Sequence, residues 1–136
     1  MSIVYINTAT KQFQIGRAGH HATLYYKAKE QEIEEIKDPG LGLGILRNSD
    51  FSQHLEVSVR TYNVGDTLFL YTDGLVEAKN AQDEQYGLSN IKNDFLLSAT
   101  KTSDEIVNKI YADMEQFVQP TPIEDDVTCL TVKFLN

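Results

Sequence analysis

Two acidic turns, Asp73-Gly74 and Asp125-Asp126, hold the residues of this sequence best suited to chemistry. Asp73 directly follows the apolar run 68–72, and Asp125-Asp126 precede the strand-like segment 127–134. Both turns therefore place carboxylates where a predicted strand meets a loop. Carboxylate oxygens at such positions are suited to hard divalent cations such as Mg²⁺ and Mn²⁺.

Each turn also has a simpler interpretation. Asp-Gly is a common turn pair, although Asp73 at a strand end would project into a crevice and Gly74 would let the backbone approach a ligand closely. Asp125 and Asp126 bring two like charges together, which is unfavourable unless a cation, a hydrogen-bond donor or water compensates. A solvated acidic loop is the alternative, and the residues alone leave both interpretations open.

Composition limits the class of protein. The 136 residues are enough for one domain, and the 41% hydrophobic content allows a modest core. The net charge of −8 argues against non-specific nucleic-acid binding, and no apolar run reaches the roughly 20 residues of a membrane span. The single cysteine, Cys129, lies in an apolar run and is expected to pack in the core, consistent with a reducing cytoplasmic setting.

The first half of the sequence has the alternating pattern of β-strands. Segments 2–7, 13–17 and 23–27 predict strands, and segment 30–37 predicts an edge strand or a loop. Leu55, Val57 and Val59 alternate with polar residues, which predicts a half-buried strand. A Gly-containing turn at 63–66 then leads into the buried strand 68–71, so these two strands are expected to form a hairpin or a close relative.

The second half changes to helical spacing. Leu88, Ile91 and Phe95 predict a helix that ends near Ser98. Thr102 and Glu105 form a capping box that opens a second helix. The buried stripe expected on this second helix consists of Ile106, Ile110, Met114 and Phe117. With the final strand 127–134, the sequence predicts an α/β (α+β) fold with mainly antiparallel strands and about two helices packed on one face.

Two further motifs receive structural interpretations. The Gly-rich segment 40–44 lacks the Lys-Ser/Thr ending of a P-loop and the strand-to-helix setting of a dinucleotide fingerprint, so we interpret it as a flexible connection. His20 and His21 are adjacent, and side chains of adjacent residues on an extended chain point to opposite sides. We therefore expect a turn in which one imidazole is hydrogen-bonded to nearby backbone, rather than a shared metal ion.

Taken in order, four segments resemble a known family. They are Ala18-Gly19-His20, 41–44, 65–78 and Asp125-Asp126-Val127-Thr128, and the resemblance is to bacterial PP2C-like serine/threonine phosphatases of the sporulation-stage-II-E and RsbU-like branch. The resemblance runs nearly end to end. It implies a PP2C-like β-sandwich with two Mn²⁺ or Mg²⁺ ions, in which a metal-bridging water attacks phosphoserine or phosphothreonine.

The resemblance also implies roles for the acidic turns. Asp73, with Gly74 beside it, would ligate metal, Asp125 would be the late ligand, and Asp126 would support it from outside. The substrate in this branch would be a phosphorylated anti-sigma-factor antagonist. One departure concerns Ala18-Gly19-His20, which the family usually follows with proline, whereas His21-Ala22 follow here.

A larger departure is an absent segment. Such phosphatases carry an earlier Gly-Asp segment that supplies the bridging carboxylate, and nothing before Ile3 corresponds to it. We therefore expect residues 1–136 to form a single incomplete PP2C-like domain, inactive or weak by itself. Without this segment one apolar face of the sheet would be exposed, and we expect that face to favour a homodimer. A non-catalytic interaction module of a signalling pathway is the alternative function.

Overall fold

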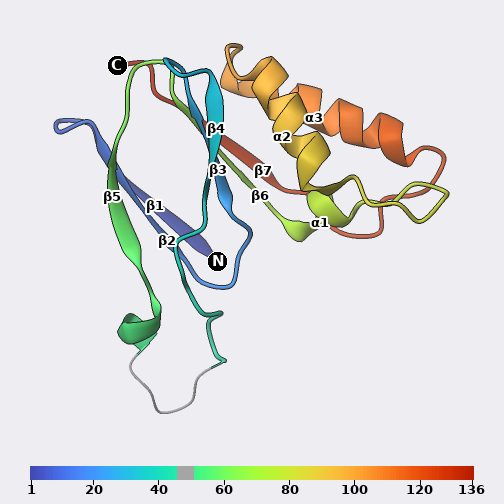
Figure 1. Cartoon of the computed structure of the whole chain (residues 1–136). Helices are drawn as coiled ribbons and strands as arrows, with labels where there is room; N and C mark the ends of the chain where they lie inside the picture. Colours follow the sequence, from blue (N-terminus) through green and yellow to red (C-terminus); the bar gives the residue numbers. More distant parts are fainter. Residues whose placement is uncertain (46–50) are drawn as a thin grey trace.

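The protein is a three-layered molecule in which two antiparallel sheets form a sandwich and helices cover one outer side (Figure 1). The computed structural model describes residues 1–45 and 51–136. This architecture confirms the α+β fold with mainly antiparallel strands that the sequence predicts.

One sheet has three strands in the order β1-β2-β5. Its members are β1 (Ser2–Asn7), β2 (Gln12–Arg17) and β5 (Val57–Thr61). We call it the open sheet, because no helix of the described chain packs on its outer face. The central strand β2 pairs with β1 and β5 in register, so Gln14 lies between Tyr5 and Val59.

The other sheet has four strands in the order β4-β3-β6-β7, and we call it the covered sheet. Its members are β3 (Thr23–Lys27), β4 (Glu32–Ile36), β6 (Thr67–Tyr71) and β7 (Cys129–Lys133). Every residue of β6 is buried, because β6 is central and both of its faces are packed. β4 is an edge strand, which decides between the strand and loop interpretations of segment 30–37.

The helices follow β6 in the chain. They are α1 (Asp73–Glu77), α2 (Gly87–Ser98) and α3 (Ser103–Val118), and a short 3₁₀ helix, η1 (Phe51–His54), precedes β5. The capping box at Thr102 and Glu105 is present, with both reciprocal hydrogen bonds formed. The stripe on α3 is buried as predicted, except that Val118 is fully packed and Phe117 is only half-buried.

The two sides of the covered sheet bury separate cores. Between this sheet and the helices lie Leu24, Tyr26 and Phe69 with the apolar faces of α2 and α3. Between the two sheets lie Phe13 and Ile15 of β2 with residues of β3 and β6. Successive side chains of a β-strand point to opposite faces of the sheet. Those of β3 and β6 therefore enter the two cores in turn, and both strands are buried on both faces.

Two sequence expectations are wrong. β5 and β6 do not form a hairpin, because β5 pairs with β2 in the open sheet whereas β6 pairs with β3 and β7 in the covered sheet. Val57 and Val59 are not on the buried side of their strand; the polar side chains of Ser58 and Arg60 face inward instead. The inward position of Arg60 is tolerated because its guanidinium forms ion pairs with Glu34 and Asp38 across the edge of the sandwich.

None of the helices within residues 1–45 and 51–136 combines the length and apolarity that crossing a bilayer would require.

Candidate metal centre

The two acidic turns, distant in the sequence, meet at one end of the covered sheet. Thr72 links them: its backbone N–H donates to the Thr128 carbonyl at 3.0 Å, and its hydroxyl donates to the Asp126 carbonyl at 3.1 Å. The same hydroxyl oxygen accepts the Thr128 N–H at 2.9 Å. β6 and β7 are neighbours in the sheet, so the residue after β6 necessarily lies beside the residues before β7. The antiparallel pairing therefore brings Asp73 and Asp125 to the same corner.

Gly74 allows the turns to approach this closely. A Cβ built on Gly74 would stand 2.5 Å from the Asp126 carbonyl oxygen and 3.4 Å from that of Asp125. Real side chains do not tolerate the first distance. Gly74 thus lets the backbone of the first acidic turn approach that of the second. Its expected role of letting the backbone approach a ligand stays a prediction.

The carboxylates of the two turns are exposed and locally oriented. Asp73 Oδ1 accepts the Gly74 N–H at 3.1 Å, and Asp125 Oδ1 accepts the Asp126 N–H at 2.8 Å. No Lys or Arg of the described residues forms an ion pair with Asp73, Asp125 or Asp126.

The Gly19-His20 turn lies near the same corner. His20 Nδ1 lies 2.9 Å from the Ser2 hydroxyl, so the imidazole has a side-chain partner and not the backbone partner that the sequence predicted. Burial lowers the pKa of His20, and the positive N-terminus, His21 and Arg17 lower it further, whereas the nearby Asp73 carboxylate opposes them. His21 turns away and stacks on Tyr71, with ring centroids 5.7 Å apart.

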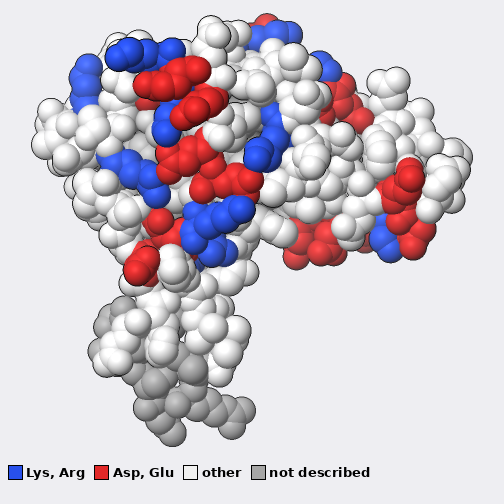
Figure 2. All heavy atoms as spheres, in the orientation of Figure 1, with Lys and Arg blue, Asp and Glu red and all other residues white. Residues whose placement is uncertain are grey.

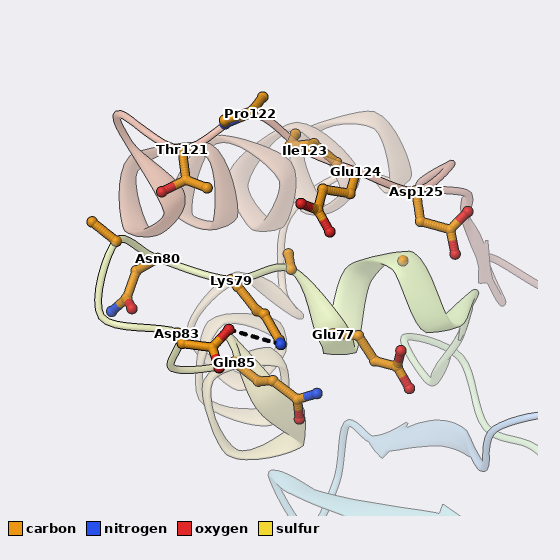
Figure 3. A pocket seen from close by; sticks show the side chains of 13 residues that line it. Glu77, Lys79, Asn80, Asp83, Gln85, Thr121, Pro122, Ile123, Glu124 and Asp125 are labelled. Atoms are coloured by element: carbon orange, nitrogen blue, oxygen red, sulfur yellow. Dashed lines mark ion pairs between the residues drawn. The ribbon is translucent and has the colours of Figure 1, made fainter.

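A pocket of about 750 Å³ opens beside Gly74 and Asp125. It lies between the 77–85 segment and the 121–125 segment, with Glu124 projecting toward its centre and Asp125 at one end (Figure 3). Lys79 and Asp83 form an ion pair on the wall of the pocket, with 2.8 Å between Lys79 Nζ and Asp83 Oδ1. No sequence pattern indicates this pocket, because both long helices, α2 and α3, separate its two walls along the chain.

The candidate ligands at this corner are of the type that a hard cation prefers, but they are few. All candidate donors at the corner are oxygens, which suits Mn²⁺ or Mg²⁺. However, residues 1–45 and 51–136 contain no group of three or more His, Cys, Asp or Glu side chains arranged to hold a metal ion. Two carboxylates would be few ligands even for one hydrated ion, and a bridged pair of ions needs more.

Comparison with known proteins identifies the family. The model of the stage II sporulation protein E (SpoIIE) family matches residues 1–135. The chain belongs to the SpoIIE family. Curated proteins gave no match.

Solved structures show that the SpoIIE-family fold of this chain is that of PP2C phosphatase domains. It superposes on the manganese-presoaked SpoIIE phosphatase domain of Bacillus subtilis with a TM-score of 0.73 and 16% identity, covering 100% of this chain and 56% of that one. The SiaA-PP2C domain of Pseudomonas aeruginosa gives 0.76 and 20%, covering 98% and 50%. The RsbU and RsbW domains of Rv1364c from Mycobacterium tuberculosis give 0.72 and 21%, covering 98% and 35%. The chain thus spans about half the length of the first two structures.

Proposed function

We propose that this chain carries the late carboxylates of a metal-dependent serine/threonine protein phosphatase. The observation that supports the proposal is the convergence of the Asp73 and Asp125 turns, which Thr72 joins by three hydrogen bonds. Paired carboxylates at one corner are suited to a divalent cation, and membership of the SpoIIE family gives that corner a phosphatase context.

In this proposal the chain's own residues hold the carboxylates ready for Mn²⁺ or Mg²⁺. Asp73 and Asp125 would be the ligands, while the Gly74 and Asp126 N–H groups fix one oxygen of each carboxylate. Asp126 would act through this backbone contact and its charge. A bound ion would activate water and neutralise phosphoryl oxygens.

We propose further that the described residues alone have little or no phosphatase activity. A two-metal centre needs more carboxylates than this corner offers, and the other ligands must come from elsewhere. Hydrolysis of a phosphoserine peptide with Mn²⁺ tests this point, and we expect turnover at background level. Robust turnover that Asp73→Asn abolishes would show that the chain is a complete catalyst.

The substrate class that we propose is a phosphorylated regulatory protein of the anti-sigma-antagonist type. The likeness to a solved chain that contains RsbU and RsbW domains supports it. A binding experiment avoids the need for turnover: the phosphorylated antagonist should bind more tightly than the unphosphorylated form, and only when Mn²⁺ and Asp73 are present. Equal binding of both forms, with or without Mn²⁺, would refute this substrate class.

The second candidate function is a non-catalytic interaction module. The small number of metal donors at the corner favours it. It predicts partner binding that Asp73→Asn and Asp125→Asn leave unchanged, so the same binding experiment separates the two functions.

A further inference from the structure

The pocket that opens beside the candidate metal centre shares residues with it. All of its lining residues lie between Gly74 and Asp125, and these two residues belong to the acidic turns themselves. The pocket and the candidate metal centre are therefore continuous. Its volume of about 750 Å³ lies within the range of roughly 300–1,000 Å³ that ligand pockets usually have. We call it the corner pocket.

The lining of the corner pocket is part apolar and part acidic. Ala78, Pro122 and Ile123 supply apolar surface. Glu77 lies at the end of α1, and Glu124 comes from the opposite wall, where its side chain projects toward the centre (Figure 3). Such a lining suits a long basic side chain, whose alkyl stem packs on apolar surface while its cationic head stays near carboxylates.

The carboxylates of Glu77 and Glu124 have no basic partner in the part of the chain that the structure describes, because neither forms an ion pair there. Among the described residues that line the pocket, Lys79 is the only Lys or Arg, and it is paired with Asp83. Along β4, by contrast, acidic and basic side chains are interleaved and paired (Figure 2). The corner pocket thus keeps an excess of negative charge.

The side chain of Lys79 shows that these carboxylates act on a cation. The hydrogen bond and the charge of Asp83 raise the pKa of Lys79 most. The charges of Glu124 and Glu77 raise this pKa further. Both glutamates therefore already attract a positive charge on the lining of the corner pocket.

We propose that the corner pocket binds a basic side chain of the phosphoprotein substrate, an arginine or lysine close in sequence to the phosphorylated residue. The inference rests on the proposed function, because it places the phosphorylated side chain at the corner formed by Asp73 and Asp125. Side chains two residues apart on an extended peptide point the same way and lie about 7 Å apart. With the phosphorylated residue at the corner, the side chain two positions before or after it would lie within reach of the pocket.

Binding of short peptides, measured by fluorescence anisotropy, tests the proposal without turnover. One phosphoserine peptide carries Arg at both the −2 and the +2 position, and a second carries Gln at both. With Mn²⁺ and low salt the Arg peptide should bind about three- to tenfold more tightly, since exposed ion pairs are individually weak. High NaCl should remove this difference, because it screens the charges.

Variants of the two glutamates locate the preference. Glu124→Gln and Glu77→Gln should each lower the preference for Arg, and the double variant should abolish it. Glu30→Gln is the matched control, because it removes the same charge from an exposed position between β3 and β4. β3 runs antiparallel to β6, with Tyr26 opposite Thr67, so Glu30 lies at the end of the covered sheet away from the corner. Glu124→Lys should shift the preference toward a phosphopeptide with Glu at the same positions.

Unphosphorylated peptides separate this inference from the proposed function. Without phosphate and Mn²⁺ binding should be weaker, yet the Arg peptide should still bind more tightly than the Gln peptide. A preference for Arg that ignores Mn²⁺, phosphate and Asp73→Asn would support the pocket and reject the phosphatase corner. Absent or equal binding of the Arg and Gln peptides, or a preference that Glu30→Gln lowers as much as the double variant, would overturn the inference.

Discussion

Gly74 lies so close to Asp126 that a Cβ on the glycine would stand 2.5 Å from the Asp126 carbonyl oxygen. Only glycine fits where the turn after β6 packs on the turn before β7. The two acidic turns are separated by more than a third of the chain, yet they act as one structural unit at the corner of the covered sheet.

The closeness of Gly74 to Asp126 predicts that Gly74→Ala is costly. The added methyl must displace backbone, and we expect a loss of about 2 kcal/mol or more in the free energy of unfolding. Urea denaturation measures it. Gly16→Ala is the control, because a Cβ there would meet its nearest neighbour, Val57 Cγ2, at an ordinary 3.7 Å. Equal costs at the two positions would contradict the tight contact described above.

Thr72 should be the side chain that holds the two turns together. Thr72→Val keeps the shape but leaves the Thr128 N–H and the Asp126 carbonyl without this partner. We expect a loss of about 0.5–1.5 kcal/mol in the free energy of unfolding, because water can reach the two groups left without the hydroxyl. The exposed Thr100 provides the control as Thr100→Val. A Thr72→Val protein as stable as wild type would mean that the hydroxyl does not join the turns.

Glu35 should make stability depend on pH. Hydrogen bonds from Lys37 and then from Lys92 lower the pKa of Glu35 below its ordinary value of 4.5. The ionised Glu35 side chain therefore stabilises the folded state above about pH 4.5. This contribution to stability is lost as the pH falls through the lowered pKa. Glu35→Gln should cost up to about 1 kcal/mol at pH 7, since the lysines are partly exposed.

The cost of Glu35→Gln should shrink as the pH falls from 5 toward 3. Chemical denaturation at each pH follows it, with the exposed Glu30→Gln as the control. A cost that stays constant over this range would indicate that the Glu35 charge contributes nothing to folding.

The sequence predicted most elements of this fold because their signals are local. Capping residues such as Thr102 and Glu105 define a helix start without reference to the rest of the chain. The partner of β5 could not be predicted in this way. Segment 63–66 resembles a hairpin turn, but it carries the chain from one sheet to the other, and only long-range packing decides this.

The predicted orientation of β5 was wrong for a related reason. Val57 and Val59 have the pattern of a buried face, and the inward position of Arg60 depends on Glu34 of β4 and on Asp38, which follows that strand. At the corner, the two acidic turns were identified from their motifs, and their roles as metal ligands stay a prediction. The linking role of Thr72 was missed, since a threonine beside Asp-Gly gives no signal of its distant partner.

Mn²⁺ titration by calorimetry tests the central claim, that Asp73 and Asp125 together bind one divalent cation. We expect weak binding, with a dissociation constant of about 10⁻⁴–10⁻³ M, typical of a site with few ligands. Asp73→Asn and Asp125→Asn should each weaken binding by about tenfold or more, and the double variant should add little, because both side chains hold the same ion. Asp104→Asn, a change at an exposed acid on α3, should leave binding unchanged. Mn²⁺ affinity that neither Asp73→Asn nor Asp125→Asn alters would contradict the account.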